Sequence, residues 1–231
     1  MTDWLSPAEW QAVRLTLDVA ARSVLFGLPP AVAVAFLLAR YRFPGHAVID
    51  SIAHLPLVLP PVVVGWLLLL LFGTRGPIGS WLLAWFGIRL VFTTGAATLA
   101  CGVMVFPLML RPIRLSIEGI DRGLDDTART LGAGPLDRLF TVVLPLAAPG
   151  ILVGAITGFA AALGEFGAVI TFAGSIPGVT QTLPLAIYSA LQVPGGEAVA
   201  ARLSLVAVAL AVAGLIGAER LGRRMRAAIG R

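Results

Sequence analysis

The chain contains several apolar stretches that are each long enough to cross a lipid bilayer, and this feature limits its fold more than any other. Residues 55–72 (LPLVLPPVVVGWLLLLLF), for example, carry no charge. A bilayer core needs roughly 20 apolar residues per helical span, and backbone groups must be paired within each span. Only 13% of the 231 residues are charged and 58% are hydrophobic, whereas a soluble domain carries about 25% charged residues. Because the alternating segments of an outer-membrane barrel are missing, the sequence predicts an all-α integral membrane protein.

We predict one transmembrane domain over residues 1–231, built as a polytopic helical bundle of about five spans. The predicted spans are residues 17–39, 49–72, 93–110, 151–172 and 203–218. Three prolines in the second stretch, Pro56, Pro60 and Pro61, indicate either a tolerated kink or a bend beside a pathway. Asp18 and Arg22 lie four residues apart, so they are expected to pair on one helical face. The span count stays open at 78–92 and 179–193, because a missed half-span there would reverse the membrane sidedness of every later segment.

The arginines predict the orientation, because cytoplasmic loops of membrane proteins carry an excess of basic residues. Successive segments between the spans lie alternately on the two sides of the membrane and so form two sets. The set that is richer in arginine holds Arg40, Arg42, Arg111, Arg114, Arg122, Arg129, Arg138, Arg220, Arg223, Arg224, Arg226 and Arg231. The poorer set holds Arg14, Arg22, Arg75, Arg89 and Arg202. We therefore expect a multi-pass protein of the cytoplasmic (inner) membrane, with its N-terminus outside and its C-terminus in the cytoplasm.

No catalytic constellation is evident. The single cysteine, Cys101, lies in an apolar run, and the two histidines, His46 and His54, show no metal-ligand pattern. A P-loop needs a lysine, and all basic residues here are arginine. An intramembrane enzyme would need a nucleophile with a base, or an Asp pair, within the spans. We expect a chain that is not an enzyme and binds no metal, and any ATP energy would come from a partner.

The most charged stretch is expected to form a short helix outside the membrane, within a loop at 117–140. Leu124, Ala128 and Leu131 share one helical face at spacings of four and three. Gly132 and Gly134 are expected to end this helix, and Pro135 can start the next. Two interpretations of this apolar face stay open. In the first it packs on lipid headgroups or on the protein's own core, and in the second it docks in a groove on a cytoplasmic partner.

Glu165 lies inside an apolar stretch, between Gly164 and Gly167. A carboxylate there costs several kcal/mol unless it is paired or hydrated, which makes it a functional candidate by default. The alternative is a structural carboxylate that accepts hydrogen bonds from backbone N–H groups or an arginine. A direct contact with an anionic substrate is disfavoured, because like charges repel.

The charged loop resembles the EAA loop of ABC importer permeases, the coupling helix that docks on the ATPase subunit. The family pattern runs Glu-Ala-Ala, Gly, Leu-Pro. In this chain Asp125 stands at the Glu, Thr127 and Ala128 stand at the two alanines, and Gly132 and Leu144-Pro145 match. With Leu131, these residues are the expected contacts with the ATPase.

The combination of FPG (43–45), HLPLVLPPVVVG (54–65), ARTLGAG (128–134), LPLAAPG (144–150), LGEFGAVITFAGSIPG (163–178) and TQTLPLAIYSALQ (180–192) resembles molybdate permeases of ABC importers over nearly the whole chain. The resemblance implies a type I importer fold and transport of molybdate, or tungstate. Sulfate or thiosulfate import is the alternative within transporters, because sulfate permeases share the Gly-Glu-Phe-Gly element. A membrane scaffold without transport and an intramembrane enzyme are the alternatives outside them.

The same resemblance implies the partners. These are a second copy of the chain, two cytoplasmic ABC ATPase subunits that hold ATP and Mg²⁺, a periplasmic or lipid-anchored molybdate-binding protein, and membrane lipid, without nucleic acid. This chain is expected to hold no cofactor of its own. Hydroxyl groups suit a transient anion, so Thr171, Ser175, Thr180 and Thr182 are expected along the path. Glu165 is a further path candidate, as the carboxylate within an apolar stretch.

Overall fold

The computed structural model describes residues 4–229, and within that range its regular secondary structure is all helical. Its elements are α1 (Pro7–Arg40), α2 (His46–Val58), α3 (Pro61–Phe72), α4 (Pro77–Phe86), α5 (Thr94–Glu118), α6 (Arg122–Thr130), α7 (Pro135–Arg138), the π-helical η1 (Leu139–Val143), α8 (Leu144–Leu163), α9 (Gly167–Phe172), α10 (Leu183–Leu191) and α11 (Glu197–Ile229). Some side chains lie outside this description, namely those of Arg122, Asp125, Asp126, Pro135, Leu215, Ala218, Glu219 and residues 221–229. Four described helices are long and apolar enough to cross a membrane, and the number rises to five if the bent pair α2 and α3 is counted as one span. The predicted all-α fold of about five spans is confirmed.

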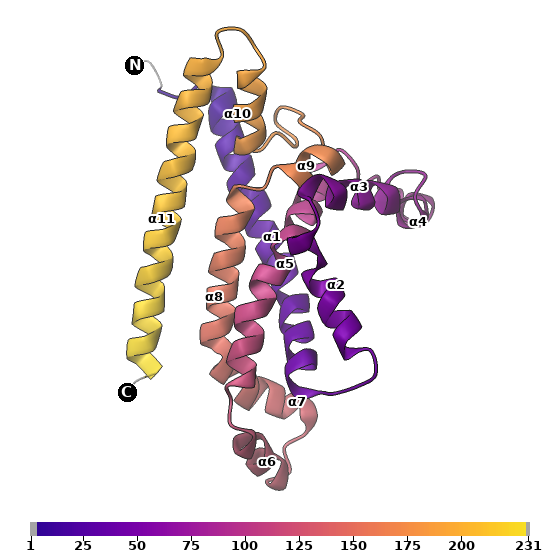
Figure 1. The fold of residues 1–231 in the computed structure, drawn as a ribbon, viewed down its shortest axis with the longest axis vertical. Helices are drawn as coiled ribbons and strands as arrows, with labels where there is room; N and C mark the ends of the chain where they lie inside the picture. Colours follow the sequence, from indigo (N-terminus) through magenta and orange to yellow (C-terminus); the bar gives the residue numbers. More distant parts are fainter. Residues whose placement is uncertain (1–3, 230–231) are drawn as a thin grey trace.

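The long helices run roughly along the length of the molecule and alternate in direction (Figure 1). The start of α1 lies at the upper end of that view, together with α9 and α10, whereas α6 and the end of α11 lie toward the lower end. The chain therefore passes along the bundle in α1, α2, α5, α8 and α11 in turn. This odd number of passes places the two ends of the chain at opposite ends of the bundle.

The core of the bundle is α5, which packs against both α1 and α8. Three glycines spaced four apart on α8, Gly150, Gly154 and Gly158, face α5. A Cβ atom at Gly154 would lie 2.8 Å from the Met109 carbonyl oxygen, and one at Gly158 would lie 2.6 Å from Met109 Cγ. Lipid supplies little hydrophobic driving force between helices, so close approach through small residues holds them together. The glycines thus let α5 and α8 meet at backbone distance.

The second predicted span, 49–72, is broken in the middle. The chain bends by 118° between α2 and α3, and Leu59 and Pro60 between them have extended backbones. A proline disfavours helical geometry in the residue before it, so Pro60 and Pro61 in succession end α2 and turn the chain. Of the two interpretations of these prolines, the structure shows a bend far larger than a tolerated kink.

The fourth predicted span, 151–172, differs from the helix that forms. The apolar helix runs from Leu136 to Leu163, and α9 follows after a break at Gly164, Glu165 and Phe166. Pro145 and Pro149 both lie inside helical structure. Glu165 consequently lies in a break between two helices and not within a continuous span.

The N-terminal half of α1 is tied to the last two helices at the upper end of the bundle. Arg202 of α11 donates from Nη2 to Glu9 Oε1 at 2.9 Å, and Glu9 is buried. The backbone N–H of Leu183, which begins α10, donates to Thr16 Oγ1 at 2.6 Å. Glu9 also forms a capping box with Ser6 at the start of α1. We call the Glu9–Arg202 and Thr16–Leu183 contacts the terminal clasp.

Candidate functional site

The helix α6 is defined by caps at both ends. The Asp121 side chain accepts from the Gly123 N–H at 2.8 Å, which satisfies one of the free donors of the first turn. At the other end Gly132 has a φ of 90°. The Ala133 N–H donates to the Ala128 oxygen at 3.0 Å and the Gly132 N–H to the Arg129 oxygen at 3.1 Å, the two bonds of a Schellman motif. The predicted sequence of short helix, glycine turn and second helix is confirmed.

The apolar face of α6 lies in the open. Leu131 is 83% exposed and Leu124 is 49% exposed, while Ala128 between them is half-buried. Figure 1 shows α6 beyond the ends of the long helices. Burying one leucine side chain gains about 1.5–3 kcal/mol. A projecting helix that exposes two of them is suited to docking against another surface.

Of the predicted coupling residues on α6, the structure describes the side chain of Thr127 but not that of Asp125. The Thr127 hydroxyl donates to the Gly123 oxygen at 2.7 Å, within its own helix. The Asp125 side chain lies outside the described residues, although its backbone is helical.

Leu144 and Pro145 lie where η1 passes into α8. Proline has no N–H, and in a helix its ring crowds the preceding turn. Here that turn widens into the π-helical segment Leu139–Val143, and the Leu144 N–H bonds to the Leu139 oxygen. π-Helical turns of this kind occur often at functional sites. The Leu-Pro pair therefore sets the local geometry of the helix that leads back into the bundle.

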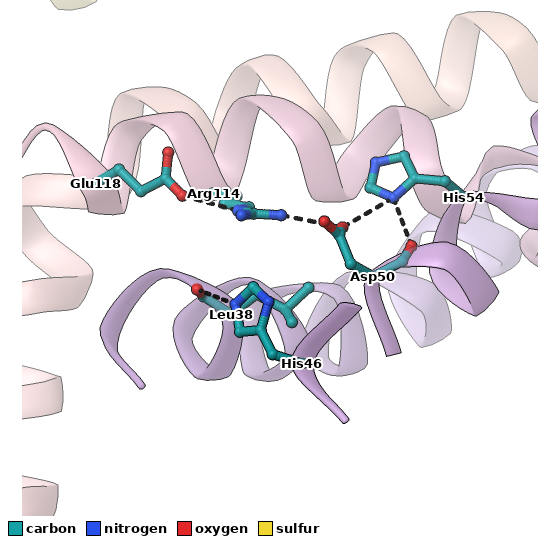
Figure 2. Close-up of polar contacts among 6 residues, drawn as sticks. All are labelled: Leu38, His46, Asp50, His54, Arg114 and Glu118. Carbon is teal, nitrogen blue, oxygen red and sulfur yellow. Dashed lines mark hydrogen bonds and ion pairs between the residues drawn. The ribbon is translucent and has the colours of Figure 1, made fainter. Parts of the chain in front are cut away.

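A group of charged side chains joins α2 to the end of α5, the end that leads into α6 (Figure 2). Arg114 Nη1 lies 3.0 Å from Asp50 Oδ1, and Arg114 Nε donates to Glu118 Oε1 at 2.8 Å. His54 Nδ1 lies 3.2 Å from the same Asp50 carboxylate oxygen and 2.9 Å from the Asp50 carbonyl oxygen. Both are acceptors, so Nδ1 carries the proton. We call these four residues the α2–α5 ion group.

Sequence reasoning missed the α2–α5 ion group as a unit. The local signal was present, since Asp50 and His54, and likewise Arg114 and Glu118, are four residues apart and share helical faces. Its central contact, between Asp50 and Arg114, joins two helices that only the fold brings together.

Glu165 serves as a local cap. Its Oε1 accepts from the Ala168 N–H at 2.9 Å, at the start of α9, and the residue is half-buried. This is the structural alternative that the sequence left open, a carboxylate bonded to backbone N–H. Thr171 is likewise engaged within α9, where its hydroxyl donates to the Gly167 oxygen at 2.8 Å.

The remaining predicted path residues lie around α9 and α10, at the end of the bundle opposite α6 (Figure 1). Thr180 is fully buried; its hydroxyl accepts from the Ile176 N–H at 2.9 Å and donates to the Gly174 oxygen at 3.1 Å. Thr182 is also buried, and among the described residues its hydroxyl has no hydrogen-bond partner.

Ser175 belongs to a half-buried polar cluster with two residues that the sequence did not single out. Gln181 Nε2 donates to Ser175 Oγ at 3.2 Å and to Ser189 Oγ at 3.3 Å, and the two hydroxyls are 3.4 Å apart. Serine and glutamine at these positions give no periodic signal, because the loop before α10 folds Ser175 back onto that helix. We call these three residues the upper polar cluster.

The sequence is similar to known membrane transport proteins. Residues 31–227 match the family described as "Binding-protein-dependent transport system inner membrane component". The chain is 54% identical to the molybdenum transport system permease protein ModB of Escherichia coli (strain K12), over 98% of this chain and 99% of that protein. It is 50% identical to the protein of the same name from Haemophilus influenzae, over 96% of this chain and 97% of that one.

The fold is similar to a solved ABC importer. The chain superposes on a bacterial alginate ABC transporter, solved in complex with its alginate pentasaccharide-bound periplasmic protein, with a TM-score of 0.76. The match covers 95% of this chain and 80% of that one at 19% sequence identity. At this identity the similarity establishes the fold alone.

Proposed function

Because the chain belongs to the family of binding-protein-dependent transport system inner membrane components, we propose that it is the permease subunit of an ATP-driven importer that carries molybdate across the cytoplasmic membrane. The substrate is supported by relatives named molybdenum permeases, which are 54% and 50% identical over nearly the whole chain. The transport role is supported by the family match and by the fold shared with an ABC importer.

In this proposal α6 is the coupling helix, and the observation that carries it is its exposed apolar face. Leu131 and Leu124 project beyond the bundle, and Ala128 between them keeps the surface close to the backbone. A groove on a cytoplasmic ATPase subunit is the destination that fits such a face. ATP hydrolysis, with its ATP and Mg²⁺, then resides in that partner and not in this chain.

The assembly has two permeases, two ATPase subunits and a molybdate-binding protein that is periplasmic or lipid-anchored. The binding protein docks at the end that carries α10, opposite α6. The alginate importer, whose fold is similar, is itself bound to a periplasmic protein. The N-terminus then faces outside, and α6 and the C-terminal arginines face the cytoplasm, as the arginine distribution favours.

The α2–α5 ion group gives a physical route for coupling. When ATP binding closes the ATPases and moves α6, the end of α5 moves with it, because only Gly119–Asp121 separate the two helices. Arg114 on α5 then pulls on Asp50 of α2 through the 3.0 Å contact. Since α2 ends at the 118° bend into α3, a shift of α2 changes the position of α3. We propose this chain of contacts as the link between ATPase closure and the gate.

Of the predicted path residues, Ser175 is the best suited to a tetrahedral dianion, because it lies in the upper polar cluster with Gln181 and Ser189. Ser175, Gln181 and Ser189 are half-buried, and hydroxyl and amide N–H groups donate hydrogen bonds to oxyanions. Glu165 is assigned instead to holding the start of α9, since its carboxylate accepts from Ala168 and would repel an anion.

Uptake of labelled molybdate tests the proposal. Cells that lack their own molybdate permease are supplied with this chain, its ATPase and its binding protein. We expect uptake that depends on ATP, falls with excess unlabelled tungstate and is unaffected by sulfate. Competition by sulfate but not by tungstate would identify a sulfate importer, and a chain that supports no uptake and retains no ATPase on purification would contradict a transport role.

A further inference from the structure

An apolar cavity lies away from the coupling helix and the upper polar cluster, on the side of the bundle between α1 and the start of α8. Its volume is about 680 Å³. One wall is the last three turns of α1, with Val32, Phe36 and Leu37, and the other is Leu139, Phe140 and Leu144. Phe140 is 64% exposed, so the cavity is a groove that opens to the surface at the depth of the membrane spans. We call it the α1–α8 groove.

A cation stands at one end of the α1–α8 groove. Arg40 is the last residue of α1 and follows Phe36 and Leu37 by one helical turn, so it continues the face that lines the groove. The residue as a whole is half-buried, while its Nε and Nη2 atoms are shielded from solvent and no described residue accepts a hydrogen bond from them. Shielding a charged group without a partner is unfavourable, so this side chain gains from meeting an anion.

The groove and the cation lie in the order that a phospholipid requires. The groove runs among apolar side chains at the level of the spans, and Arg40 lies where α1 ends, at the same end of the bundle as α6 (Figure 1). We propose that the α1–α8 groove binds one phospholipid from the leaflet on the α6 side, with an acyl chain in the groove and the phosphate on Arg40.

The phosphate contact accounts for most of the selectivity. An acyl chain leaves one apolar environment for another when it enters the groove, so it gains packing but little hydrophobic free energy. Arginine hydrogen bonds to phosphate are charge-assisted and about twice as strong as neutral ones. Binding is therefore expected to depend on Arg40 more than on any one apolar side chain of the groove.

Lipid titration of the purified chain tests this proposal. The delipidated protein in detergent is titrated with phosphatidylglycerol, and bound lipid is counted by native mass spectrometry. We expect Arg40→Gln to weaken binding of the first lipid about tenfold, a change equivalent to about 1.4 kcal/mol. Arg42→Gln is the matched control, because it removes the same charge from an exposed residue two positions on, and it should change binding less than twofold.

Two further variants keep the test informative if Arg40→Gln folds poorly. Arg40→Lys keeps the charge and should retain most of the binding, whereas Ala33→Trp fills the groove and should reduce binding without touching the charge. Equal losses in Arg40→Gln and Arg42→Gln would overturn the proposal, as would unchanged binding in Ala33→Trp. An Ala33→Cys variant that forms disulfide-linked dimers in membranes would assign the groove to a second copy instead. No arm measures transport, so failure here leaves the proposed function standing.

Discussion

At the scale of single residues, the shape of the coupling segment depends most on Gly132. Its φ of 90° lies in the left-handed region, which a residue with a Cβ adopts at a cost of roughly 1–2 kcal/mol. A Cβ there would meet no atom within 4 Å, so strain in the backbone is the whole effect of a small side chain. Gly134, two residues on, is equally open but has no such φ.

Gly132→Ala is therefore expected to weaken ATPase binding, and Gly132→Glu to abolish it together with molybdate uptake, while membrane insertion stays normal. The backbone strain loosens the end of α6 and turns its apolar face, and the glutamate adds a charge to the docking surface. ATPase co-purification and uptake measure both effects. Gly134→Ala is the control and should behave as the wild type. Normal co-purification and uptake in Gly132→Glu would contradict the assignment of α6 as the coupling helix.

The Asp50–Arg114 contact is the second residue-scale prediction. The two side chains are 33% and 21% exposed, so the solvent exposure of this ion pair is intermediate between that of a surface pair and that of a buried pair. Removing either partner in Asp50→Asn or Arg114→Gln should lower the free energy of unfolding by about 1–2 kcal/mol. The double variant should lose less than the sum of the two. Unfolding in detergent is the measurement.

The exposed pair Asp18–Arg22, at 2.9 Å, supplies the matched control for this cycle. Its side chains are 42% and 52% exposed, and pairs of this kind contribute about 0.3–0.5 kcal/mol. If both cycles gave the same small coupling, the α2–α5 ion group would have no special role. Reduced uptake at normal ATPase binding in Arg114→Gln would support the proposed link from α6 to α2.

Contacts near in sequence were predictable and distant ones were not. The spacing of Asp18 and Arg22 predicted their pair, and Gly132 predicted the end of α6, because both depend on a single turn of helix. Glu9 and Arg202 are 193 residues apart, and no local pattern marks either as the partner of the other. The role of Glu165 became clear only once the break before α9 placed its carboxylate beside the Ala168 N–H.

At the scale of the helices, the association of α5 with α8 rests on close backbone approach. A Cβ atom at Gly154 would meet the Met109 carbonyl oxygen, and this backbone atom cannot move aside as the end of a flexible side chain can. Sequence hydropathy located both helices but misplaced the bounds of the second, because the π-helical turn before Pro145 lets the helix continue through a proline. The bend between α2 and α3 was visible as consecutive prolines, although its size was not.

Gly154→Ala is expected to destabilise the protein by about 1–3 kcal/mol, the usual effect of overpacking a filled core. Gly214→Ala is the control, since α11 has nothing within 4 Å of a Cβ at that position. Alanine is preferred to glycine within a helix by roughly 0.5–1 kcal/mol, so the control should be neutral or stabilising. Thermal unfolding in detergent compares the two. Equal stability of both variants would contradict the tight α5–α8 contact.

At the scale of the whole molecule, the odd number of passes sets which segments face the same side. The loop between α10 and α11 lies at one end of the bundle and α6 at the other (Figure 1). The distribution of arginines along the chain is enough to predict these opposite positions, because that prediction needs only the number of spans and the side of each loop.

Thiol labelling tests the orientation. Val193, between α10 and α11, is 60% exposed, and Thr130 at the end of α6 is exposed. In right-side-out vesicles, a membrane-impermeant maleimide should label Val193→Cys directly, and Thr130→Cys only after permeabilisation. The native Cys101 is 1% exposed and gives the unlabelled background. The reverse pattern would invert the proposed sidedness, and labelling of both from one side would contradict the fold itself.

The terminal clasp has a consequence for the order in which the protein is made. Glu9 leaves the ribosome 193 residues before Arg202, an interval of roughly 10–40 s at ordinary rates of synthesis. Throughout that time a carboxylate that ends up buried has no cation to meet. Assembly of the upper end therefore waits for the synthesis of α11, and a product that stops before α11 leaves the Glu9 carboxylate without the arginine that neutralises it.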